Sequence, residues 1–178
     1  MNAAGPIAYY LSLYRHLHGD GAQVPFPAPE KSWKATHTDT SAYILSRFEI
    51  YAALHPEKTA SRSFNIADGD VVTWSDVWGG IVGYFGLKPG QPDPSWGSIK
   101  DFFHKHEKEW EEVVQKKGLV KRKENDTTWN FAQAILNRTF DSPYDLTAAR
   151  EAGFSEKVPT VNSYTGVFDK MRAAKYIP

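Results

Sequence analysis

A chain of 178 residues with 41% apolar and 24% charged side chains is long enough to bury one core, so we expect a single domain over residues 1–178. Lys plus Arg and Asp plus Glu both number 21, and this balance argues against nucleic acid as a partner. The absence of cysteine excludes disulfides, thiolate metal sites and cysteine nucleophiles. The sequence has no secretion signal and no apolar run long enough to cross a membrane, so we expect a cytoplasmic protein without a membrane partner.

Apolar periodicity and end signals predict the helices in chain order. The first helix is expected over residues 3–18 and the second over 41–54, where Thr38 to Ser41 supply capping side chains and His55-Pro56 ends the helix. The next is expected over 73–85, followed by a long charged helix over 98–117 and a solvated connector at 121–124. The remaining helices are predicted at 127–139, 146–152 and 163–175.

Strand signals are few and scattered. Alternating prolines make residues 24–29 extended, and short strands are predicted at 33–37 and 62–67. One or two isolated strands do not form a stable sheet. The pattern therefore predicts an α+β, mostly helical fold with about six helices and a few short strands, or a piece that packs against another chain.

Motifs for cofactors and metals are absent. The glycines at 79, 80 and 83 fall inside a predicted helix, so they do not form a dinucleotide-binding loop. His104 and His106 are two positions apart and point away from each other on a helix, so they do not share a metal ion. We therefore predict neither a cofactor nor a metal.

The aromatic content is high, with six Trp, nine Tyr and ten Phe. Large rings suit a core and also suit a pocket for a flat apolar ligand. Trp129, Phe131 and Ile135 share one predicted helix, where they form either core or the wall of a pocket. His37 stands next to Asp39 near a helix start and has two interpretations, an acid or base and a structural hydrogen bond.

Several stretches in a fixed order resemble one known family. They are the opening Met1-Asn-Ala-Ala, Val24-Pro-Phe-Pro, Thr38-Asp-Thr-Ser, Phe64-Asn-Ile-Ala-Asp68, Trp74-x-x-x-Trp78, Tyr84-Phe-Gly86, Trp129-x-Phe131, the segment from Leu146 to Phe154, and the terminal run from Phe168 to Pro178. Over nearly the whole chain this order resembles the C-terminal half of the progesterone 5β-reductase/iridoid synthase-like (PRISE) extended short-chain dehydrogenases, of fungal type.

The resemblance implies a substrate-binding lobe that lacks the Rossmann half, with the glycine-rich loop and the catalytic Tyr and Lys lying outside this chain. It places Phe131 and Ile135 in the wall of a pocket for a steroid or monoterpene, with Tyr9 and Tyr10 facing the same space. We also assign substrate binding to Trp129, Tyr164 and Phe168.

Three functional hypotheses follow. The first is a cofactor-independent enzyme of specialised metabolism that cyclises or isomerises a hydrophobic polyketide- or terpenoid-like molecule, with His37, Asp39, Tyr9 and Tyr10 as its catalytic groups. The second is a truncated or split NADPH-dependent reductase that needs a Rossmann-type partner chain. The third is a non-catalytic small-molecule-binding or interaction protein. We also expect a homodimer, because loss of the Rossmann half would uncover apolar surface.

Overall fold

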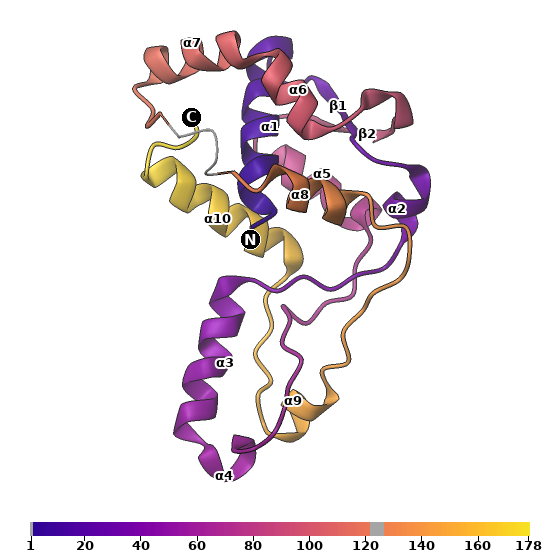
Figure 1. The fold of residues 1–178 in the computed structure, drawn as a ribbon, viewed down its shortest axis with the longest axis vertical. Helices are drawn as coiled ribbons and strands as arrows, with labels where there is room; N and C mark the ends of the chain where they lie inside the picture. The colour runs from indigo at the N-terminus through magenta and orange to yellow at the C-terminus, as the bar shows by residue number, and fades with distance from the viewer. Residues whose placement is uncertain (1, 122–126) are drawn as a thin grey trace.

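The computed structural model describes residues 2–121 and 127–178 and arranges the larger part of them around helix α1 (Ala4–His18; Figure 1). Every residue of α1 from Ala4 to Tyr14 is buried, as expected for a helix that is apolar on all sides. The other helices of this body are α2 (Glu30–Lys34), α5 (Trp74–Gly83), α6 (Ile99–Lys105), α7 (Glu107–Lys117), α8 (Trp129–Leu136) and α10 (Thr160–Ala173).

A two-stranded parallel sheet lies at the side of the body. Strand β1 (Gln23–Phe26) pairs with β2 (Lys88–Pro92), with Gln23 opposite Lys88. Gly90 allows this pairing, because a Cβ atom at that position would lie 2.9 Å from the Val24 carbonyl oxygen. Parallel neighbours require a long crossover connection, and here the crossover includes α3 to α5.

A smaller lobe extends below the body in Figure 1. It consists of α3 (Ala42–Leu54), α4 (Pro56–Thr59) and α9 (Thr147–Glu151), and it has its own apolar cluster. The buried members of that cluster are Ile44, Phe48, Ala149 and Phe154. Chain segments run between the lobe and the body, and His37 joins two of them through bridges to Val72 and Ser142.

The helix starts read from capping residues are confirmed. Ser41 caps α3, since its Oγ accepts a hydrogen bond from the Ile44 amide at 3.2 Å. Thr73 and Asp76 form a reciprocal capping box at the start of α5. Gly118 ends α7 in the left-handed conformation with φ of 60°. Within the described ranges, no helix is long and apolar enough to span a membrane.

The predicted number of about six helices is wrong. The described part of the chain has ten α-helices and a 3₁₀ helix, η1 (Pro94–Trp96). One cause is that the long helix predicted over 98–117 breaks at His106 into α6 and α7. The break lets both halves pack on α1, since Phe102 contacts Tyr10 and Trp110 contacts Tyr9.

Both predicted strands are also wrong. In the segment predicted at 33–37, Trp33 and Lys34 end helix α2 and only His37 pairs, through isolated bridges; 62–67 has no regular structure. Residues 62–67 have no neighbouring strand: the Ile66 carbonyl accepts from the Thr40 hydroxyl instead. The observed strand β1 overlaps the segment predicted as extended over 24–29, and β2 lies where no strand was predicted. The connector predicted at 121–124 lies, except for Lys121, outside the described residues.

Candidate functional site

A cavity of about 320 Å³, here called the Asp39 cavity, opens where the lobe joins the body. The start of α1, the segment that leads into α3, helix α8 and helix α10 contribute to its wall. Its apolar side consists of Phe131, Ile135 and Val167. Its polar lining includes Asp39, Asp68, Arg138, Ser163 and Tyr164.

Helix periodicity explains how two of these helices reach the cavity. Phe131 and Ile135 are four residues apart on α8 and therefore lie on the same face. On α10, Ser163 and Val167 have the same spacing, and Tyr164 is adjacent. The two helices thus contribute an apolar wall and a hydroxyl pair to one space.

The Asp39 carboxyl group is the most perturbed acid of the cavity. Burial raises its pKa above the ordinary value; His37, Tyr164 and Arg138 oppose this shift and Asp68 adds to it. Its Oδ2 atom lies 3.8 Å from His37 Nε2, too far for a hydrogen bond. Neither atom has a hydrogen-bond partner among the described residues. Burial also raises the pKa of the Tyr164 hydroxyl, and the nearby Asp39 carboxyl group adds to this shift.

Hydrogen bonds from Asp68 hold the backbone around Asp39 in place. It is fully buried, and its Oδ1 atom accepts hydrogen bonds from the Ser41 amide at 3.0 Å and the Ser41 hydroxyl at 2.5 Å. Its own amide donates to the Asp39 carbonyl at 2.8 Å. Asp68 therefore connects two parts of this region: its carboxylate binds Ser41 at the start of α3, and its amide binds Asp39, which lines the cavity.

The structure brings four of the predicted site residues together and separates the other five. Asp39, Phe131, Ile135 and Tyr164 all line the Asp39 cavity. His37 lies behind Asp39, with its ring 5.1 Å from that of Trp74. Tyr10 and Phe168 are fully buried and line neither cavity, while Tyr9 and Trp129 line a different one.

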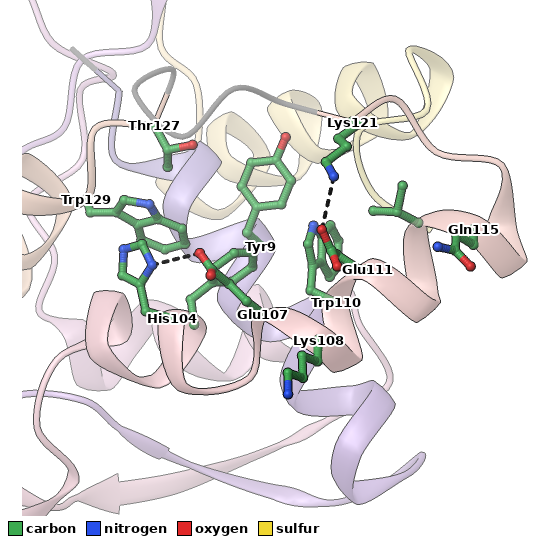
Figure 2. A pocket seen from close by; sticks show the side chains of 12 residues that line it. Tyr9, His104, Glu107, Lys108, Trp110, Glu111, Gln115, Lys121, Thr127 and Trp129 are labelled. Atoms are coloured by element: carbon green, nitrogen blue, oxygen red, sulfur yellow. Dashed lines mark hydrogen bonds and ion pairs between the residues drawn. The ribbon is translucent and has the colours of Figure 1, made fainter.

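This second cavity, of about 540 Å³, lies between α1, α7 and the start of α8 (Figure 2). Its aromatic lining consists of Tyr9, Phe103, Trp110 and Trp129. Two pairs of its polar side chains lie in contact: His104 lies 2.9 Å from Glu107, and Lys121 lies 3.0 Å from Glu111 (Figure 2). The Asp39 cavity instead contains a buried carboxyl oxygen without a hydrogen-bond partner among the described residues, so we place the candidate chemistry there.

Three polar residues of the Asp39 cavity were missed from the sequence. Asp68 was named only as the end of a stretch that resembles the family, and nothing in the local pattern distinguished Arg138. The hydroxyl at 163 could have been found from its helical spacing to Val167. Arg138 follows the end of α8, and only the fold places it beside Asp39.

The glycines of α5 do not form a loop for a dinucleotide, and the described residues contain no cluster of side chains for a metal ion. Gly79, Gly80 and Gly83 lie within α5, and a Cβ atom at Gly80 would lie 2.7 Å from a methyl group of Val161, so this surface packs on α10. Within 2–121 and 127–178, no group of three His, Asp or Glu side chains is arranged to hold a metal. No chemical step is therefore assigned to either group.

The described chain is mostly helical, as predicted, and its parallel strand pair is compatible with an α/β domain. A cavity where an apolar wall meets a few buried polar groups is a site of the kind that binds small molecules. The family model described as "PRISE-like Rossmann-fold domain" matches residues 2–178. The chain belongs to this family, which confirms the resemblance to PRISE-type short-chain dehydrogenases. Because the description names a Rossmann-fold domain, it gives no support to the expectation that the chain lacks the Rossmann half.

The relatives are short-chain dehydrogenases and enol synthases. The chain is 32% identical to "Short chain dehydrogenase ausT" of Aspergillus calidoustus and 30% identical to "Short chain dehydrogenase sirR" of Leptosphaeria maculans, with 97% of the chain covered in both cases. It is 28% identical over its whole length to "(S)-8-oxocitronellyl enol synthase CYC2" of Camptotheca acuminata. The matches cover 43%, 46% and 45% of these relatives, so the chain spans less than half of their length.

Proposed function

We propose that this chain binds an apolar small molecule in the Asp39 cavity and catalyses a non-redox isomerisation or cyclisation without a cofactor. One observation carries the proposal: an apolar wall of Phe131, Ile135 and Val167 meets a buried carboxyl group with a raised pKa. A perturbed acid in a cleft is typical of general acid–base sites. The names of the relatives, which include enol synthases, also support enol chemistry.

The proposed step moves one proton and needs no oxidant or reductant. The Asp39 carboxylate accepts a proton from the carbon next to a ligand carbonyl. The electron pair of the broken C–H bond forms a carbon–carbon double bond, and the π pair of the carbonyl moves to the oxygen. The carboxyl group then returns the proton at the same or a conjugated carbon. The Tyr164 hydroxyl, which lines the same cavity near Asp39, orients the carboxylate for this transfer.

Deuterium exchange tests the step without knowledge of the natural substrate. The purified chain is incubated in D₂O with β-ionone, an apolar ketone, and loss of the proton signals next to the carbonyl is followed by NMR without NADPH. We expect exchange above the buffer rate in wild type and loss of this excess in Asp39→Asn. A matched control, Asp101→Asn, removes an acid outside the Asp39 cavity and keeps the exchange. Wild-type exchange no faster than buffer would refute the proposed catalysis.

A second candidate is a truncated or split NADPH-dependent reductase completed by a Rossmann-type partner chain. The two-stranded parallel sheet favours it, because such sheets are normally larger and covered on both faces. The short coverage of the relatives agrees with it. Tight stoichiometric binding of NADPH by the chain alone would contradict the view that this chain lacks the Rossmann half.

A non-catalytic binding protein is the third candidate, and it predicts ligand binding with no exchange in wild type or in Asp39→Asn.

For the assembly we propose a homodimer. One exposed face of α3 carries Tyr43, Ile50 and Leu54. Ile50 and Leu54 follow Tyr43 by seven and eleven positions, which places all three on the same side of the helix. Light scattering should give twice the chain mass for wild type and a smaller mass for Ile50→Lys; a monomeric wild type would contradict the dimer.

A further inference from the structure

Arg138 contributes the cationic side chain of the Asp39 cavity. Among the described residues no other Lys or Arg lines this space, and no Asp or Glu lies within ion-pair distance of its guanidinium. One nitrogen of the group donates to the Ser142 hydroxyl at 2.5 Å. Since arginine carries five N–H donors, most of its donor capacity stays available to a ligand.

The other charges of the cavity restrict what Arg138 can bind. Asp39 and Asp68 line the same space, so a ligand carboxylate would meet two acids beside the single cation. The Oδ1 atom of Asp68 accepts from Ser41, but Oδ2 of Asp68 and Oδ2 of Asp39 have no hydrogen-bond partner among the described residues, so both acids would repel an anionic ligand. A neutral oxygen that only accepts hydrogen bonds suits the guanidinium and avoids this repulsion.

We infer that Arg138 donates a hydrogen bond to a ligand carbonyl oxygen, so that the Asp39 cavity selects apolar ketones or aldehydes over the matching alcohols and carboxylic acids. The inference deepens the proposed function and rests on ligand binding in this cavity. In the proposed proton transfer, the oxygen gains negative charge when Asp39 removes the neighbouring proton. A guanidinium fixed near that oxygen stabilises the charge as it develops.

The experiment compares two probes with one carbon skeleton, the ketone β-ionone and the alcohol β-ionol, by titration calorimetry. Wild type should bind the ketone more tightly. Arg138→Met keeps much of the apolar stem and removes the donors; it should weaken β-ionone by about tenfold, as for a lost hydrogen bond to a charged group. The loss for β-ionol should be smaller, because an alcohol can also donate to Asp39.

Two further variants separate recognition from folding. If its thermal transition shows that Arg138→Met is unfolded, Arg138→Lys replaces it in the test. This variant keeps the charge and should retain part of the ketone preference. Arg15→Met removes an exposed arginine outside both cavities and should leave both affinities unchanged.

The outcomes also distinguish this inference from the proposed function. Equal affinities for ketone and alcohol in wild type, or a folded Arg138→Met protein that still prefers the ketone, would overturn the role of Arg138 while ligand binding stands. If neither probe binds to wild type, the proposed function fails together with the inference.

Discussion

Replacement of Ser41 by alanine tests how much the contacts of its hydroxyl stabilise the fold around the Asp39 cavity. The Ser41 hydroxyl makes two contacts: it accepts from the Ile44 amide at the start of α3, and it donates to the buried Asp68 carboxylate at 2.5 Å. Loss of a helix cap costs about 1 kcal/mol. Loss of a hydrogen bond to a charged group costs about 1.5–3 kcal/mol. Together, Ser41→Ala should lower the free energy of unfolding by about 2.5–4 kcal/mol.

Ser98→Ala is the matched control. Ser98 also caps a helix, since its hydroxyl accepts from the Asp101 amide at 3.0 Å at the start of α6, but it has no buried carboxylate partner in the described structure. Urea unfolding followed by tryptophan fluorescence should therefore show a loss of about 1 kcal/mol for Ser98→Ala. Equal losses for the two variants would show that the contact between Ser41 and Asp68 contributes nothing, and would refute the reasoning.

Two other predictions concern pH and strand pairing. Because burial raises the pKa of Asp39, the folded chain holds the carboxyl proton more tightly than the unfolded chain does. The stability of wild type relative to Asp39→Asn should therefore fall as pH rises through the raised pKa. Urea unfolding at several pH values checks this, and a stability difference that stays constant with pH would contradict it. Gly90→Ala should destabilise by about 1–3 kcal/mol, because its methyl group would crowd the Val24 carbonyl. Gly166→Ala, with open space in α10, should stabilise by about 0.4–1 kcal/mol; the opposite order in thermal unfolding would contradict the packing argument.

Local chemistry made several features predictable from the sequence. The cap at Ser41, the capping box at Thr73 and the stop at Gly118 depend only on near neighbours in the chain, and all three were found at or near their predicted places. The spacing of Phe131 and Ile135 set a shared helix face in the same way. The start of α10 was missed by three residues, because Asp70 hydrogen-bonds to the Thr160 amide and hydroxyl from a distant segment.

The sequence by itself determined the helical character, the aromatic core, the family and the position of Gly79, Gly80 and Gly83 within a helix. Only the tertiary structure decided which side chains share a cavity. Asp39, Asp68, Arg138 and Tyr164 come from separate segments, and no local pattern encodes their meeting point. It also separated Tyr9 from Tyr10 and paired β1 with β2, because burial and strand pairing depend on contacts between segments far apart in the chain.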